Sequence, residues 1–245
     1  MNKLYNFGDS YSGNLYDFTR VNHYTKIISE MIGYGYEPLG FGGASNEQIL
    51  NIILYNMNEF KKGDIVFINW SFFSRGCWFD QNSKKVNSTN IFYNEVESLK
   101  HFDLTKKFGL KQSDKILGLL DYYLYNTEDY VRRLFKLIES TIKYIESIGV
   151  SVYFIFVDDV VYSDELIRYG TNIKFENGFA KWLIKYNFHN EEEGHYTKGI
   201  QPALANALFK KTNNFGKNVK KKIETNIDDV DMNKIIEPNK LDFLL

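Results

Sequence analysis

The chain has 245 residues, of which 44% are hydrophobic, and these can fill the core of one sizeable domain without disulfide bonds. Its 30 basic and 31 acidic residues leave a net charge of −1, so charge gives no reason to expect nucleic acid or an anionic membrane as partner. Cys77 is the only cysteine, which excludes an intrachain disulfide and leaves no sign of an oxidising compartment.

The beginning of the sequence leaves no room for a signal peptide, because the first predicted strand starts at about residue 3. No uninterrupted apolar run approaches the length of a membrane span. We therefore expect a soluble protein made in the cytoplasm. Incorporation into a virion, or release by lysis, leaves no trace in a sequence and stays open.

The first stretch that carries chemistry is residues 6–12, with the sequence NFGDSYS. It follows the apolar Leu4 and Tyr5 and reads as a strand that ends in a turn. Gly8 relieves the backbone there, Asp9 can fasten the turn through its carboxylate, and Ser10 is then left at the carboxyl edge of a sheet. Open α/β sheets bind ligands at that edge.

The next elements alternate between helix and strand. Apolar spacing predicts a helix over 23–32 that ends at Gly33, and a short strand over 36–41 follows. Ser45 and Gln48 have the spacing of a capping box, which predicts the start of a helix. Residues 64–70 are almost continuously apolar, as the central strand of a parallel sheet requires.

The remainder of the chain predicts an α/β fold with an insertion and an extension. Residues 71–126 lack a clean period and read as an insertion, either a lid or a surface excursion. A helix over 127–149 and a buried strand over 150–157 imply a right-handed parallel crossover, and helices are predicted over 175–186 and 199–211. Residues 1–212 form the predicted domain, and the extension 213–245 is expected to dock on it or on another subunit.

A base for Ser10 is available near the other end of the sequence. His195 comes three residues after Glu192 and just before a predicted helix. An imidazole in this setting can be oriented through one ring nitrogen while the other faces the serine. None of His23, His101 and His189 has both an acidic residue three positions before it and a helix start after it.

Three sequence blocks resemble those of the SGNH (GDSL-type) hydrolases: GDSYS, GFGGASN and EEGHYTKG. They bracket nearly all of residues 1–212. The resemblance implies a three-layer α/β/α sandwich with a mostly parallel, flavodoxin-like sheet. It also implies serine catalysis on esters, thioesters or carbohydrate O-acyl groups without a cofactor, so the expected partner is a small-molecule or glycan acyl ester.

The resemblance assigns roles to individual residues. Ser10 becomes the nucleophile, with Ser12 as its rival, and His195 becomes the base. Glu192 stands where the family has an aspartate, although a solvated acidic run that includes Glu193 explains it nearly as well. Gly43 matches the glycine whose amide binds the oxyanion, a role that is compatible with a tight turn.

One departure from the family follows the central strand. Phe73 stands where the family has the asparagine that donates to the oxyanion. Ser71, Asn69 and Asn46 are candidate substitutes. Arg75 is a candidate for binding an anionic part of a substrate, although a structural salt bridge is the commoner role of a lone arginine.

The sequence leaves three hypotheses. The first is a serine ester or O-acyl hydrolase, with Trp70, Phe72 and Trp78 either facing a sugar or packing in the core. The second is a non-catalytic member of the same fold, a binding or structural subunit such as one of a viral particle, which assembles with copies of itself or another partner through 213–245. The third is a metal site of His189, Glu191 and Asp158. The sequence lacks the glycine patterns of nucleotide-binding sites.

Overall fold

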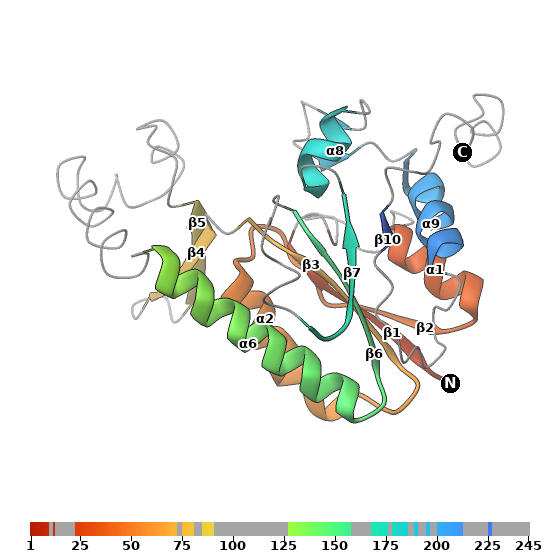
Figure 1. Ribbon diagram of the computed structural model, residues 1–245, viewed down its shortest axis with the longest axis horizontal. Coiled ribbons are helices and arrows are strands. Elements are labelled where there is room, and N and C mark those ends of the chain that lie inside the picture. Colours follow the sequence, from red (N-terminus) through yellow and green to blue (C-terminus); the bar gives the residue numbers. More distant parts are fainter. Residues whose placement is uncertain are drawn as a thin grey trace.

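Figure 1 shows the computed structural model. The residues that it describes are 1–9, 12, 23–72, 75–80, 85–90, 127–157, 168–175, 178–185, 189–190, 195–196, 200–212 and 225–226. Within these, it describes the backbone alone for 75–80, 85–90, 127–131, 184, 189–190, 195–196, 200, 210–211 and 225–226.

The centre of the molecule is a sheet whose neighbouring strands are all parallel. In spatial order its strands are β10 (Thr225–Asn226), β7 (Thr171–Lys174), β6 (Ser151–Phe156), β3 (Ile65–Trp70), β1 (Lys3–Gly8) and β2 (Gly35–Pro38). From β2 to β7 this is the flavodoxin-like order 2-1-3-4-5, once the strands outside the sheet are left out. β3 is buried along its whole length between β1 and β6, as its apolar sequence predicts.

Helices cover both faces of this sheet. One face packs against α1 (Tyr24–Ile32), α8 (Phe179–Lys185) and α9 (Ile200–Lys211), and the other against α2 (Asn46–Asn56) and α6 (Thr127–Ser147). In Figure 1, α2 and α6 lie together on one side of the sheet, and α1 and α9 on the other. The predicted three-layer α/β/α class is therefore confirmed.

The two cores follow from the alternation of side chains along each strand. In β3, Ile65 and Phe67 point toward the α1, α8 and α9 layer, whereas Val66, Ile68 and Trp70 point toward α2 and α6. A polar residue at the end of a strand therefore belongs to one layer or the other according to its position. Strand parity therefore determines which candidate residues lie on the same face of the sheet and can act together.

The capping signals that the sequence predicts for α1 and α2 are confirmed. Ser45 Oγ accepts from the Gln48 amide at 3.3 Å, and Gln48 Oε1 accepts from the Ser45 amide at 2.9 Å, which completes the capping box of α2. His23 caps α1, and Gly33 ends that helix in the left-handed conformation. The predicted crossover is also confirmed, because β6 follows α6 and pairs parallel to β3.

Several elements were not predicted. β7 precedes α8, and α8 begins at Phe179 rather than at 175. The predicted insertion contains an antiparallel pair, β4 (Arg75–Asp80) and β5 (Lys85–Asn90), while residues 91–126 lie outside the described part. A second small pair joins β8 (His189–Asn190) to β9 (His195–Tyr196), and a short 3-10 helix (Met57–Glu59) follows α2. None of the helices that the structure describes is long and apolar enough to cross a membrane.

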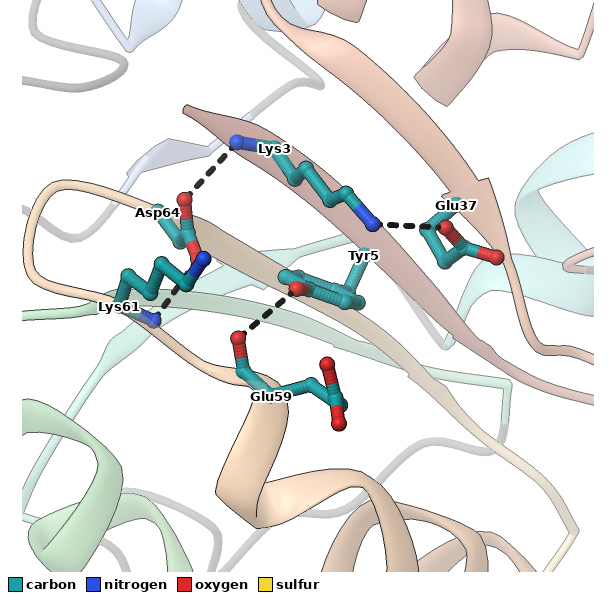
Figure 2. Close-up of polar contacts among 6 residues, drawn as sticks. All are labelled: Lys3, Tyr5, Glu37, Glu59, Lys61 and Asp64. Atoms are coloured by element: carbon teal, nitrogen blue, oxygen red, sulfur yellow. Dashed lines mark hydrogen bonds and ion pairs between the residues drawn. The ribbon is translucent and has the colours of Figure 1, made fainter. Parts of the chain in front are cut away.

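Asp64 fastens the amino-terminal edge of the sheet (Figure 2). Its side chain is almost fully buried, and its two carboxylate oxygens accept from the backbone amides of Lys3 and Lys61, each at 2.8 Å. Nearby, the Tyr5 hydroxyl donates to the Glu59 carbonyl at 3.2 Å. Asp64 therefore holds the start of β1 against the start of β3, which supports the register that pairs Gly8 with Asn69 at the opposite edge.

We expect Asp64→Asn to lower the free energy of unfolding by about 1–3 kcal/mol, because one oxygen becomes an amide group that faces a backbone donor. Urea denaturation measures this change. Glu59→Gln is the matched control: the contact there uses only the Glu59 carbonyl, so we expect a change within about 0.5 kcal/mol. Equal stability of Asp64→Asn and the wild type would contradict this role of Asp64.

Candidate active site

The carboxyl ends of β1 and β3 lie side by side near the centre of the sheet. In a flavodoxin-like order this is the topological switch point, outside which ligands bind. Asp9 directly follows β1, and Ser71 directly follows β3. Ser10 is the next residue after Asp9 and lies outside the described residues.

A buried polar chain connects three segments at this edge. The Ser71 hydroxyl donates to Asp9 Oδ2 at 2.8 Å, and Asn46 Nδ2 donates to the Ser71 carbonyl at 3.1 Å. All three side chains are buried. A hydrogen bond to a buried carboxylate is among the stronger ones, so this chain fixes the end of β1, the end of β3 and the start of α2 relative to one another.

Gly43 shapes the turn that leads into α2. Its φ is 80°, a left-handed value that favours glycine, and the Ala44 amide donates to the Phe41 carbonyl across the turn at 3.4 Å. Asn46 begins the helix three residues later. Gly43 and Asn46 therefore belong to one short segment at the positive end of the α2 dipole.

The backbone segments at this edge are packed too closely for larger residues. A Cβ at Gly8, whose φ is 146°, would overlap the Ser12 hydroxyl and lie 2.6 Å from the Asn69 carbonyl oxygen. A Cβ at Gly40 would lie 2.7 Å from the Ser12 Cβ. The loop after β2 thus presses against the turn that carries Asp9 and Ser12.

Ser12, the rival nucleophile, uses its hydroxyl in a hydrogen bond that stabilises the turn. Its hydroxyl donates to the Phe7 carbonyl at 2.9 Å, and its amide donates to the Asp9 carbonyl at 2.9 Å. Its carbonyl accepts from Asn6 Nδ2. Ser12 is therefore a buried part of the turn after β1.

Asn69 lies on the opposite side of the sheet from Asn46. Its Oδ1 accepts from the Tyr24 hydroxyl of α1 at 2.7 Å. Its Nδ2 is buried without a partner among the residues that the structure describes. Asn69 pairs in register with Gly8, so it lies within the strand, two residues before Ser71.

Burial raises the pKa of Tyr24 well above its ordinary value of 10.0. Tyr36 and Asp9 raise it further, while the hydrogen bond to Asn69 opposes the shift. In the folded state Tyr24 keeps its proton, whereas in the unfolded chain it ionises near pH 10. Its contribution to stability is complete below that pH and is lost as pH rises above it.

For Tyr24→Phe we expect two effects in urea denaturation between pH 7 and pH 11. The free energy of unfolding drops by about 1–3 kcal/mol at pH 7, because Asn69 Oδ1 loses its buried donor. Above pH 10 the decline in stability becomes shallower by about 1.4 kcal/mol per pH unit, since one linked proton has been removed. Tyr55→Phe is the control because that ring is 88% exposed, and equal slopes in all three proteins would contradict the shift.

The start of α9 is tied to the same edge. The Tyr24 amide donates to Gln201 Oε1 at 2.9 Å, and Gln201 is buried in the first turn of α9. Tyr24 therefore bonds through its backbone to the helix that follows His195, and through its hydroxyl to the strand beside β1. These bonds connect two parts of the chain that are 177 residues apart.

His23 has a structural role. Its Nδ1 accepts from the Thr25 amide at 3.3 Å and lies 2.6 Å from Thr25 Oγ1, which in turn is 3.0 Å from the Tyr36 hydroxyl. Asn6 Nδ2 donates to the same Tyr36 hydroxyl at 3.2 Å. Because Nδ1 accepts from the Thr25 amide, the neutral ring carries its proton on Nε2, and neither nitrogen has a lone pair available to act as a base.

The structure describes some of the other predicted site residues and not others. Ser10, Glu192 and Glu193 lie outside the described residues, whereas Asn46, Asn69, Ser71 and Gly43 lie at the carboxyl edge of the sheet or at the adjoining helix start. The backbone of His195 opens β9 opposite Asn190, and the backbone of Arg75 opens β4 opposite Asn90. Asp158 and Glu191 of the metal hypothesis also lie outside the described part.

Two aromatic residues near the site belong to the core, and two polar contacts at the site were not predicted. Trp70 is fully buried in the α2 and α6 core, and Phe72 packs against the other core, so core packing accounts for both. Tyr24 and Gln201, which connect α1, α9 and β3, were not predicted as site residues. The one available signal was a polar residue at the start of each helix.

No family model and no curated protein matches this sequence. Among solved structures, the chain is similar to the crystal structure of protein YxiM from Bacillus subtilis, with 12% identity and a TM-score of 0.47 over 86% of this chain and 56% of that one. This chain therefore spans just over half the length of that protein. It is also similar to a lipase/acylhydrolase from Enterococcus faecalis, with 13% identity and a TM-score of 0.42 over 86% of this chain and 95% of that one. The strand order of the chain itself gives the three-layer α/β/α fold that the resemblance to SGNH hydrolases implies.

Proposed function

We propose that this protein hydrolyses an ester or O-acyl group by serine catalysis. Ser10 is the nucleophile, His195 the base, and Glu192 the carboxylate that orients the imidazole. The backbone amides of Ser10 and Gly43 bind the oxyanion. The substrate class includes acyl groups on carbohydrates as well as small-molecule esters.

The hydrogen bonds of Tyr24 are the observation that carries this proposal. They join Gln201, six residues after His195, to Asn69, whose strand partner Gly8 comes two residues before Ser10. Tyr24 thus contacts the helix that follows the proposed base and the strand that pairs with β1, which precedes the proposed nucleophile, and this supports the proposed pairing of the two. The switch point between β1 and β3 supports the same location for a ligand.

The chemistry needs no group beyond these side chains and water. Ser10 Oγ bonds to the acyl carbon while its proton passes to His195, and the carbonyl electrons move onto the oxygen to form the oxyanion. The oxyanion then collapses, the bond to the leaving oxygen breaks, and His195 returns its proton to that oxygen. Water repeats the sequence on the acyl-enzyme, which releases the acid and regenerates Ser10.

Turnover of p-nitrophenyl acetate, followed by a set of O-acetylated sugars, tests the proposal. We expect the wild-type protein to release p-nitrophenol above the rate of buffer, and faster release from a sugar acetate would define the substrate class. A folded protein that hydrolyses none of these esters would contradict the proposal. That outcome would instead support a non-catalytic subunit of the same fold, for which Phe73 at the position of the family's asparagine is one motivating feature, beside Glu192 in place of an aspartate and the extension 213–245.

A further inference from the structure

The oxyanion hole of the proposed hydrolase lacks one of the hydrogen-bond donors that the family has. Two backbone amides can serve it, but Phe73 stands where the family supplies a side-chain amide. Losing one such donor typically costs about a hundredfold to a thousandfold in kcat. Ser71, Asn69 and Asn46 are the polar side chains at this edge that could replace it, and their hydrogen bonds distinguish them.

The replacement donor needs a free N–H or O–H on the same side of the sheet as Gly43, and Ser71 and Asn69 do not provide one. The single hydroxyl proton of Ser71 is donated to the Asp9 carboxylate at 2.8 Å. Asn69 reaches toward α1 and bonds to Tyr24, on the face of the sheet opposite to α2. Gly43 precedes Ala44, which packs in the core on the α2 face, so Asn69 and Gly43 belong to opposite faces of the sheet and Asn69 is the less favourable candidate.

Asn46 meets the requirement. It lies three residues after Gly43, in the same segment and at the positive end of the α2 dipole. Its Nδ2 donates one hydrogen to the Ser71 carbonyl at 3.1 Å and carries a second. The opposite amide orientation would set Oδ1 against that carbonyl, so the bond fixes which atom is the donor.

Neighbouring groups hold the Asn46 side chain in place. The side chain is 1% exposed, and its Oδ1 has no hydrogen-bond partner within the described part of the chain. An oxyanion is itself an acceptor and cannot satisfy Oδ1, so the donor role depends on the second hydrogen of Nδ2 alone. The position of Asn46 depends on Ser71, and that of Ser71 depends on Asp9.

We propose that Asn46 Nδ2 is the third donor to the oxyanion, and that Asp9 positions it through Ser71. This assignment rests on the proposed hydrolase function. Asn46 acts on the reacting oxygen directly, whereas Asp9 acts only by holding the Ser71 hydroxyl. The buried hydrogen bond from Ser71 to Asp9 thus both joins the ends of two strands and helps to position Asn46.

The test compares Asn46→Asp and Asn46→Ala with the wild type, using p-nitrophenyl acetate and a boronic acid that forms a tetrahedral anion on serine. Aspartate is nearly isosteric, is favoured in the first turn of a helix, and has no N–H. We expect kcat to fall about a hundredfold or more in both variants while KM changes little. We expect boronate affinity to weaken in parallel with kcat/KM.

Asn56→Ala is the matched control, since Asn56 caps the other end of α2 through a bond to the Ile52 carbonyl. Its kcat and boronate affinity should equal those of the wild type. A thermal melt for each protein separates catalysis from folding, because a purely structural role would lower Tm without weakening boronate binding relative to the substrate.

The outcomes separate this inference from the proposed function. If the wild-type protein neither hydrolyses acyl esters nor binds the boronate, the proposed function fails, and the inference fails with it. If the wild type is active and folded Asn46 variants keep its kcat, the assignment of Asn46 alone is overturned. Loss of kcat in Asn69→Ala together with retention in Asn46→Asp would place the donor on the α1 face instead.

Discussion

Replacing Ser10 with alanine is expected to abolish acyl ester hydrolysis while leaving the fold intact. Loss of a serine nucleophile in a triad lowers kcat by as much as about a millionfold, and only residual catalysis by oxyanion donors and substrate binding remains. Initial rates with p-nitrophenyl acetate at saturating substrate measure this loss. Circular dichroism and a thermal melt establish that the variant is folded.

Ser12→Ala is the matched control for Ser10→Ala. It removes the bond from the Ser12 hydroxyl to the Phe7 carbonyl, which costs stability on the order of 1 kcal/mol but leaves Ser10 in place. We expect Ser12→Ala to keep most of the wild-type kcat. Loss of activity in folded Ser12→Ala, with retention in Ser10→Ala, would exchange the roles of the two serines.

The second large effect is expected at His195. His195→Ala removes the group that takes the Ser10 proton, so kcat should fall by four to six orders of magnitude, about as much as after loss of the nucleophile. Added imidazole should restore part of the rate if the cavity that is left admits it. Single-turnover kinetics with the same ester measure whether acylation is the step that slows.

His189→Ala is the control for this variant, because His189 lies in the same small β8–β9 pair opposite Tyr196. We expect it to retain wild-type kinetics. If His189→Ala removed activity and His195→Ala did not, the base would be the other histidine, and the connection through Gln201 and Tyr24 would be structural only.

Much of the fold follows from the sequence, because the signals that predict it are local. The Ser45 and Gln48 capping box, the apolar run of β3 and the period of α6 each specify an element without reference to the rest of the chain. β7 carries no such signal: its sequence is TNIK, and Asn and Lys are poor strand formers. β8 and β9 are too short to show any period.

The candidate site could be predicted only as a set of residues, because its hydrogen bonds depend on register. The bond from Ser71 to Asp9 joins residues 62 apart and requires that β1 and β3 pair with Gly8 opposite Asn69. Strand parity then sends Asn69 toward α1, whereas Asn46 is carried by α2 on the other face. From the sequence alone, Asn46, Asn69 and Ser71 were equivalent candidates.

Labelling of the folded wild-type protein with a fluorophosphonate probe, followed by peptide mass spectrometry, tests the central claim most directly. The account predicts a single stoichiometric adduct on Ser10, which is absent from Ser10→Ala and forms far more slowly in His195→Ala. An adduct on another serine, or a folded protein that stays unmodified at high probe concentration, would contradict it.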